Sequence, residues 1–250
     1  MLNKKYKTAL ITGAATGIGY TILKKLRQEN IKVIALDKDK KKLNKVCDNT
    51  KSSPICLDLR NTNKVYKLLS NIKVDILISN AGTGKGIDGL LKSSKNEIED
   101  SSKVNVESHL HVLKCLVPNM VKKRKGHIIL MGSLAGLYPV DSAVYGSQKG
   151  AIHRMAQNLR IELQGTRVKV TEICPGRTKT NFAINTFNNQ KKAKKFMSGF
   201  SILSPEDIAE AALFALNTNW RSNISLIEIS GTEQTPGGIP VHPVQDPILD

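Results

Sequence analysis

The chain has 250 residues, of which 40% are apolar and 24% charged, a balance typical of a globular protein. This composition excludes collagen-like, coiled-coil and wholly disordered chains. No run approaches the roughly 20 apolar residues that a membrane-spanning helix needs. Lys and Arg number 38 against 21 Asp and Glu, which gives a net charge of +17.

Such a charge can indicate a nucleic-acid partner, an anionic membrane or acidic substrates. The lysines, however, are spread along the whole chain, with short clusters at 4–5, 38–42, 122–125 and 191–195. Aromatic residues, which would stack on bases, make up only 4%. We therefore expect no nucleic-acid or membrane partner, and a lysine-rich composition bias is the simpler explanation of the charge.

Four cysteines lie in or beside apolar runs and form no C-x-x-C pair: Cys47, Cys56, Cys115 and Cys174. This pattern predicts buried free thiols in a reducing compartment. The apolar stretch after Lys4 and Lys5 is interrupted by glycines, so we expect no targeting segment and a cytoplasmic protein.

Short apolar runs alternate with longer amphipathic segments along the chain. Strands are predicted at residues 7–13, 32–37, 54–59, 74–80, 127–133, 167–174 and 225–229. Helices are predicted at residues 18–29, 63–70, 104–122, 145–163 and 205–216, the last beginning with a capping Ser204 and Pro205. Most strands are continuously apolar, which is typical of a parallel sheet covered on both faces.

The predicted fold class is therefore α/β, a single-domain Rossmann-like doubly wound parallel sheet flanked by helices. It is expected to span residues 1–230 as one dinucleotide-binding and catalytic domain. Residues 231–250 are rich in Pro and Gly and are predicted to form an extended C-terminal tail.

A glycine-rich segment joins the first strand to the first helix. It reads Thr-Gly-Ala-Ala-Thr-Gly-Ile-Gly over residues 12–19. Such glycines let backbone N–H groups approach a phosphate at the helix N-terminus, although a glycine-rich turn alone can be only a turn. The position of this one favours cofactor binding, with these contact residues: Gly13, Thr16, Gly17, Ile18 and Gly19.

Two carboxylates follow the next strands. Asp37 ends the second strand, where it can accept hydrogen bonds from a ribose and repel a 2′-phosphate, which favours NAD over NADP. The lysines that follow it could instead offset a 2′-phosphate, and Asp37 could be a turn residue. Asp58 and Leu59 end the third predicted strand, where the carboxylate could meet the adenine or be a solvated strand-end residue.

Together these motifs resemble the short-chain dehydrogenase/reductase family over the chain up to about Gly231. Besides the glycine turn, the resemblance rests on Asn80-Ala81-Gly82, on Asn105, on Ser133, on Tyr145-x-x-x-Lys149 and on Pro175-Gly176. It implies hydride transfer between a nicotinamide cofactor and an alcohol or carbonyl. It also implies further cofactor contacts from Asn80, Ala81, Gly82, Tyr145, Lys149, Pro175, Gly176, Thr178 and Thr180.

Tyr145 and Lys149 are four residues apart in a predicted helix, so they share one face. The nearby ammonium is expected to lower the pKa of the tyrosine, which would bring Tyr145 toward acid–base catalysis. Ser133 follows a strand at the end of the sheet where ligands bind, and its hydroxyl can contact the reacting oxygen. The resemblance adds Asn105 as the holder of a water that links Lys149 to solvent.

The substrate is less well defined by the sequence. Arg177, at the expected rim of the site, could clamp an acidic group such as that of a 3-hydroxy acid, or be a solvated loop residue. Ser133, Tyr138 and Tyr145 are the other candidate substrate contacts, and residues 181–200 form the family's mobile lid. Alternatives are an NADP-dependent ketone reductase, including an acyl-carrier-linked one, and a non-catalytic nucleotide-binding protein. We expect no metal and a homodimer or homotetramer.

Overall fold

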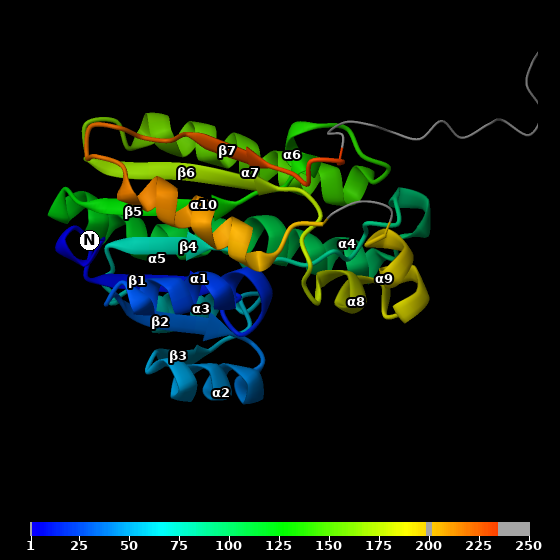
Figure 1. The fold of residues 1–250 in the computed structure, drawn as a ribbon, viewed down its shortest axis with the longest axis horizontal. Helices are drawn as coiled ribbons and strands as arrows, with labels where there is room; N and C mark the ends of the chain where they lie inside the picture. Colours follow the sequence, from blue (N-terminus) through cyan, green and yellow to red (C-terminus); the bar gives the residue numbers. More distant parts are fainter. Residues whose placement is uncertain (1, 199–201, 235–250) are drawn as a thin grey trace, which may run out of the picture.

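One parallel sheet forms the centre of the molecule. The computed structural model describes residues 2–198 and 202–234, and in this part of the chain seven strands pair in the order β3-β2-β1-β4-β5-β6-β7 (Figure 1). Their bounds are Thr8–Thr12 (β1), Lys32–Asp37 (β2), Ser53–Cys56 (β3), Ile76–Ser79 (β4), Gly126–Met131 (β5), Val168–Pro175 (β6) and Leu226–Ile229 (β7). Each predicted strand is present, and the predicted fold class is confirmed.

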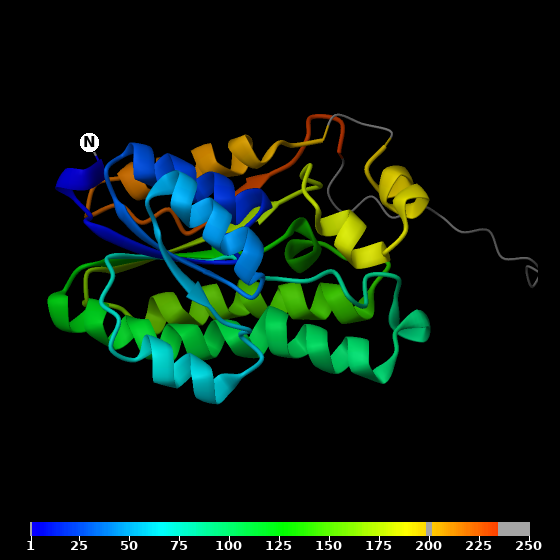
Figure 2. The ribbon, with the colours of Figure 1, turned by 90° about the horizontal axis from the view of Figure 1, so that it is seen from below.

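Helices cover both faces of the sheet (Figure 2). On one face lie α1 (Gly17–Gln28), α2 (Lys40–Thr50) and α10 (Pro205–Asn217), and on the other lie α3 (Thr62–Leu69), α5 (Ser108–Lys123) and α7 (Ala143–Glu162). The apolar residues accordingly form two cores, one on each side. Among the described residues, no helix is both long and apolar enough to cross a bilayer.

Burial falls from the central strands to the edges of the sheet. All residues of β4 and β5 are buried, whereas most of β3 is exposed at one edge. The expectation of four buried thiols is therefore wrong for Cys56, which lies on this edge strand and is exposed. Cys47, Cys115 and Cys174 are free and buried, as predicted.

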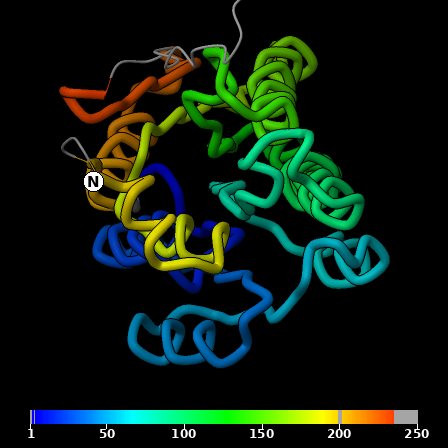
Figure 3. The backbone as a smooth tube through the Cα atoms, turned by 90° about the vertical axis from the view of Figure 1, so that its right-hand side faces the viewer, coloured from blue at the N-terminus to red at the C-terminus, as the bar shows by residue number. Residues whose placement is uncertain are grey.

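Short elements gather at the carboxyl ends of the strands, which Figure 3 views end-on. Their bounds are Leu90–Lys92 (η2), Lys95–Ser102 (α4), Lys103–Glu107 (η3), Leu134–Leu137 (α6), Phe182–Phe187 (α8) and Gln190–Phe196 (α9), while η1 (Leu2–Lys4) opens the chain. The predicted lid thus contains two short helices. The predicted helix at 104–122 begins instead with a π-helical turn, η3, a distortion often found at functional sites.

The strand order reverses between β1 and β4. Thr12, the last residue of β1, bridges them, because its hydroxyl accepts hydrogen bonds from the backbone N–H groups of Asn80 (2.9 Å) and Ala81 (3.0 Å). Ligands of doubly wound sheets bind at such a reversal, outside the carboxyl ends of the strands. The fold therefore places a ligand crevice beside the glycine-rich turn.

The predicted C-terminal tail is described only at its start. Residues Gly231 to Gln234 form a turn in which Gln234 N–H donates to the Gly231 carbonyl at 2.9 Å. The rest of the predicted tail, from residue 235, lies outside the described residues.

Candidate active site

A cavity of about 1540 Å³ opens at the carboxyl end of the sheet. It extends from Asp37, at the end of β2, to Tyr145 on α7, so one continuous space reaches both ends of the predicted site. All the predicted site residues line it except Gly19 and Asn105, which support it from behind.

The glycine-rich turn has the backbone geometry that its sequence predicts. Gly13 (φ +66°) and Gly17 (φ +56°) adopt left-handed conformations that favour glycine. A Cβ on Gly19 would lie 2.2 Å from the Gly13 carbonyl oxygen, so the turn closes only with glycine there. Helix α1 starts without a side-chain cap on Thr16, which leaves its first N–H groups directed at an anion site.

Asn80 holds this turn in place. Its side-chain amide donates to the carbonyls of Thr12 at 3.0 Å and Gly13 at 3.3 Å. Asn80 therefore joins the end of β4 to the glycine-rich turn, in addition to lining the cavity.

The segment after β6 completes the opposite wall. Pro175 ends this strand, and the Thr178 hydroxyl donates back to the Gly176 carbonyl at 3.1 Å. A Cβ on Gly17 would contact the Thr180 side chain at 3.2 Å, so this segment packs against the glycine-rich turn. Two loops far apart in sequence thereby enclose the middle of the cavity.

At the far end of the cavity, Asp37 uses both carboxylate oxygens to fix the backbone. One accepts from Ala15 N–H at 3.1 Å and the other from Asp39 N–H at 3.0 Å. Asp58, which lies two residues beyond the end of β3 rather than at it, pairs with the Arg60 guanidinium at 2.7 Å. That contact lowers the pKa of Asp58 and neutralises its charge, so Asp37 is the less compensated carboxylate.

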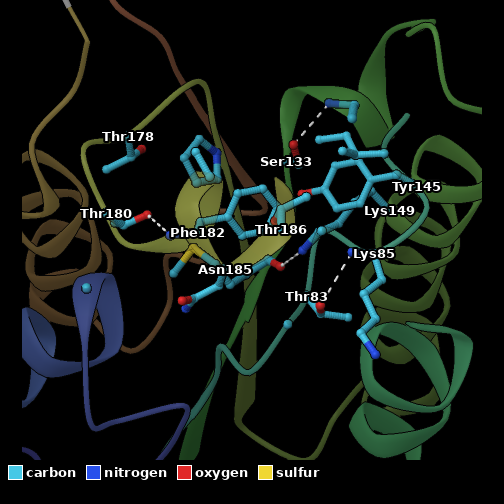
Figure 4. A pocket seen from close by; sticks show the side chains of 18 of the residues that line it. Thr83, Lys85, Ser133, Tyr145, Lys149, Thr178, Thr180, Phe182, Asn185 and Thr186 are labelled. Atoms are coloured by element: carbon cyan, nitrogen blue, oxygen red, sulfur yellow. Dashed lines mark hydrogen bonds between the residues drawn. The ribbon is translucent and has the colours of Figure 1, made fainter. Parts of the chain in front are cut away.

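Ser133, Tyr145 and Lys149 lie together on one side of the cavity, as Figure 4 shows. Ser133 caps α6 by accepting from Ala135 N–H at 3.2 Å. Tyr145 and Lys149 occupy successive turns of α7 and are only 8% and 7% exposed. The Lys149 ammonium donates to the Met131 carbonyl at 3.0 Å and lies 6.0 Å from the centre of the Tyr145 ring.

Burial has the largest effect on the pKa values of Tyr145 and Lys149. It raises the pKa of Tyr145 to about 12, while a hydrogen bond with Ser133 acts in the opposite direction. The expectation that Lys149 lowers the pKa of Tyr145 is therefore wrong for this geometry: desolvation raises that pKa, and Lys149, whose ammonium is bound to the Met131 carbonyl, is not among the groups that shift it. Burial also lowers the pKa of Lys149 to about 8, against the opposing effects of Cys174 and Glu172.

Asn105 lies in the π-helical turn η3 with its side chain fully engaged. Its Oδ1 accepts from Thr83 N–H at 2.8 Å, and its Nδ2 donates to the Thr83 carbonyl at 2.9 Å and to Gln148 Oε1 at 2.8 Å. These bonds tie the loop after β4 to α7. The Asn105 side chain thus anchors the loop and does not line the cavity.

The lid packs directly over the site. The Phe182 ring of α8 lies 6.0 Å from the Tyr145 ring, and a Cβ on Gly84 would lie 2.2 Å from Thr186 Oγ1. Lys192 of α9 pairs with Asp88 at 3.7 Å. The lid helices therefore contact the loop after β4 and cover the Tyr145 end of the cavity.

Arg177 lines the cavity beneath this lid. Its Nη1 donates to the Phe196 carbonyl at 2.8 Å, and its guanidinium lies 4.3 Å from the centre of the Phe196 ring. Its backbone N–H donates to Gln234 Oε1 at 3.0 Å. Arg177 is thus a junction between the lid and the start of the C-terminal segment, as well as a rim residue. Tyr138, the remaining predicted contact, lines the cavity and donates its hydroxyl to Glu228 at 2.9 Å.

Sequence reasoning missed Phe182, Thr186 and Gln234. The first two lie in the segment expected to be the mobile lid, and its helix of six residues is too short to leave a clear periodic pattern. Gln234 carried no signal, because its contact with Arg177 depends on the folded path of the chain.

The burial of Lys149 predicts a pH-dependent cost to stability. The unfolded chain keeps a lysine pKa near 10.5, so it binds more protons than the folded state between about pH 8 and 10.5, and stability should rise across that window. The free energy of unfolding of Lys149→Met should therefore exceed that of the wild type by up to about 3 kcal/mol near pH 7, and this difference should disappear as the pH rises. Thermal unfolding at several pH values measures the difference, with the exposed Lys73→Met as control. An advantage that does not change with pH would contradict this prediction.

Comparisons with known proteins agree with this geometry. The family model for short chain dehydrogenases matches residues 7–191. The chain is 31% identical over 235 residues to an uncharacterized short-chain type dehydrogenase/reductase of Sinorhizobium fredii, covering 94% of this chain and 95% of that protein. It is 32% identical over 243 residues to an NADP-dependent 3-hydroxy acid dehydrogenase of Escherichia coli, covering 93% and 98%.

A solved structure of similar fold is the closed form of serine dehydrogenase complexed with NADP⁺. The TM-score is 0.89 at 31% identity, covering 95% of this chain and all of that one. A crystal structure of serine dehydrogenase from Escherichia coli gives a TM-score of 0.78 at 29% identity, covering 91% and 99%. From its sequence, its fold and its cavity, the chain belongs to the short-chain dehydrogenase family and is an oxidoreductase.

Proposed function

We propose that this protein transfers a hydride between NAD(H) and the hydroxyl-bearing carbon of a small hydroxy acid or the matching oxo acid. The main support for the proposal is the arrangement of three side chains, two on α7 and one at the start of α6. A buried Tyr145 hydroxyl is hydrogen-bonded to Ser133, with Lys149 one helical turn away, at one end of a cavity that begins at the glycine-rich turn.

In the proposed mechanism Tyr145 is the general acid–base. In reduction the Tyr145 hydroxyl donates its proton to the developing alkoxide and becomes a phenolate, and in oxidation the Tyr145 phenolate takes the proton from the substrate alcohol. Ser133 donates a hydrogen bond to the same substrate oxygen and fixes its position beside Tyr145. A bound nicotinamide cofactor would supply or accept the hydride.

The residues present fit a dinucleotide along the cavity. The left-handed Gly13 and Gly17 and the uncapped start of α1 would hold the pyrophosphate, and Lys149 would bind the ribose next to the nicotinamide. Pro175, Gly176, Thr178 and Thr180 would flank the nicotinamide. Asn105 would act indirectly, by anchoring Thr83 and the loop after β4.

Replacing Tyr145 with Phe tests the catalytic proposal. The variant keeps the ring that packs beside Phe182 and loses only the hydroxyl, so we expect kcat to fall by about 10²- to 10⁴-fold with cofactor binding unchanged. Tyr66→Phe is the matched control, since its hydroxyl bonds to His111 outside the cavity lining, and it should stay within a few-fold of the wild type. Equal effects of the two substitutions would contradict the role of Tyr145, and normal cofactor binding without turnover in the wild type would favour a binding protein.

NAD is the proposed cofactor because Asp37 presents a carboxylate where a 2′-phosphate would lie. Its two oxygens are held by backbone N–H groups, so it cannot easily turn away. The relatives and structures whose names include NADP favour the alternative, and Lys38, which also lines the cavity, could serve a 2′-phosphate. An NADP-dependent reductase is therefore the second candidate.

Nicotinamide fluorescence during titration with NADH and with NADPH decides between the two cofactors. We expect the wild type to bind NADH more tightly. Asp37→Asn keeps a hydrogen-bonding oxygen but removes the charge, so it should shift the preference toward NADPH by about tenfold. The control is Asp39→Asn, which removes a charge two residues away, outside the cavity lining, and keeps a capping side chain for α2. A wild type that prefers NADPH, with Asp37→Asn leaving the ratio unchanged, would establish the second candidate.

The proposed substrate carries an acidic group. Relatives of this chain have names that include 3-hydroxy acid and serine, both of which bear a carboxylate. Arg177 lines the same cavity in a partly buried position, where its guanidinium could bind a carboxylate through paired hydrogen bonds. This supports Arg177 as the clamp for the acidic group.

Substrate pairs test the clamp. For Arg177→Gln we expect kcat/KM for a 3-hydroxy acid to fall about 10- to 100-fold more than for its neutral methyl ester. Phe196→Leu, which removes the ring under the guanidinium but keeps the charge, controls for disturbance of the lid. Equal losses for the acid and the ester in Arg177→Gln would show that Arg177 serves only the lid.

A further inference from the structure

A second ionisable cluster lies directly behind the site, in residues that the proposed mechanism does not use. Its centre is Glu172 of β6, whose side chain is completely buried. A carboxylate in such a position is costly unless it is paired and hydrogen-bonded. Its partners therefore indicate what it does.

Both oxygens of Glu172 accept hydrogen bonds. His153 of α7 donates from Nδ1 to Oε2 at 2.7 Å, and the Cys174 thiol donates to Oε1 at 3.2 Å. Because an ionised carboxylate only accepts hydrogen bonds, Nδ1 of His153 carries the proton, while the Nε2 of His153 lies 2.9 Å from Gln157 Nε2. With two donors directed at it, Glu172 is placed to carry a negative charge.

This carboxylate touches the backbone that carries the reacting groups. A Cβ on Gly132 would lie only 2.4 Å from Glu172 Oε1, so no side chain separates Glu172 from the segment between Met131 and Ser133. The backbone N–H of Ser133 hydrogen-bonds the Cys174 sulfur, and the Met131 carbonyl accepts from the Lys149 ammonium. Three backbone positions therefore join the Glu172 cluster to Ser133 and Lys149.

The charges around the cluster favour one partner for Glu172. Lys149 is buried, and its ammonium donates to the carbonyl of Met131, which supplies no counter-charge. Other ionisable groups nearby are Arg160 of α7, which donates to the Ser225 carbonyl, and Glu228 of β7, which pairs in register with Cys174 and bonds to Tyr138. On the other side of Lys149 lies His109 of α5, whose burial lowers its pKa to about 3 and keeps it neutral. The negative charge of Glu172 acts to keep the ammonium of Lys149 protonated, against the effect of burial, whereas the Cys174 thiol, whose pKa burial raises, is neutral.

We propose that Glu172 is a positioning residue of the active site, whose buried carboxylate, held by His153, is the counter-charge that keeps Lys149 protonated and whose contact with Cys174 steadies the backbone of Ser133. The proposal rests on the role of Lys149 given under the proposed function. A neutral side chain at position 172 would leave Lys149 protonated over a narrower pH range.

The protonation of Lys149 can be measured without substrate or cofactor, so this test is independent of the proposed reaction. For the wild type and for Glu172→Gln, the melting temperature is compared with that of the same protein carrying Lys149→Met, from about pH 6 to about pH 10.5. The difference falls between the pKa of Lys149 in the folded protein and its pKa in the unfolded chain, so the midpoint of this fall moves by half of any change in the folded pKa. We expect Glu172→Gln to lower the folded pKa of Lys149 by about one unit and the midpoint by about half a pH unit. The matched control is Asp75→Asn, which removes another buried carboxylate just before β4, at the opposite end of the sheet.

An unchanged midpoint in Glu172→Gln, or an equal shift in Asp75→Asn, would overturn the proposal. If Glu172→Gln does not fold, His153→Leu removes the donor that holds the carboxylate, and it should move the midpoint in the same direction by a smaller amount. No shift in that variant would likewise overturn the proposal. In the active enzyme, the basic limb of the kcat/KM profile should move with the midpoint, whereas a purely structural role would lower activity at all pH values alike.

Discussion

The burial of the Lys149 ammonium is the interaction on which the geometry of the site depends. A charged group that is only 7% exposed requires nearby polar partners, and Lys149 donates to the Met131 carbonyl while the charge of Glu172, on the neighbouring strand, favours its protonated form. To provide both, α7 must pack closely against β5 and β6. That packing brings Tyr145, one turn earlier on the same helix, beside Ser133 at the end of β5. The reacting groups are thus held by the rigid centre of the fold.

The other half of the site depends on the reversal of strand order between β1 and β4. Thr12 and Asn80 join the two strand ends, and the same contacts hold the glycine-rich turn open toward the cavity. The lid then closes over the Tyr145 end through contacts with Gly84 and Asp88. Rigid strand ends therefore position the cofactor turn and the acid–base group, while a helical lid contacts both walls.

Hydrophobic patterning was sufficient to predict the sheet, because strands buried on both faces leave continuous apolar runs. It did not predict α2, whose buried residues are only Leu43, Val46 and Cys47 among lysines and asparagines, although Asp39 offered a cap. Nor could it predict the exposure of Cys56, since the position of β3 at the sheet edge follows from the strand order. The π-helical turn at Asn105 likewise has no periodic signature.

Within the site, residue spacing predicted the glycine-rich turn and the shared face of Tyr145 and Lys149, because both are local properties of the chain. Spacing could not give the degree of burial, which is why the direction of the Tyr145 pKa shift was wrong. The contacts of Thr186, Gln234 and Glu172 join segments far apart in sequence and emerged only from the folded structure.

The most direct test of the central claim is to follow a deuterium atom from C4 of the nicotinamide of labelled NADH into the product of a small 3-oxo acid. Mass spectrometry would detect it, with each face of the nicotinamide labelled in turn. We expect one of the two labelled cofactors to give a 3-hydroxy acid with deuterium on the carbon that bears the hydroxyl group. A hydroxy acid without deuterium from either cofactor, or no consumption of NADH with any oxo acid, would contradict NAD-linked hydride transfer at this site.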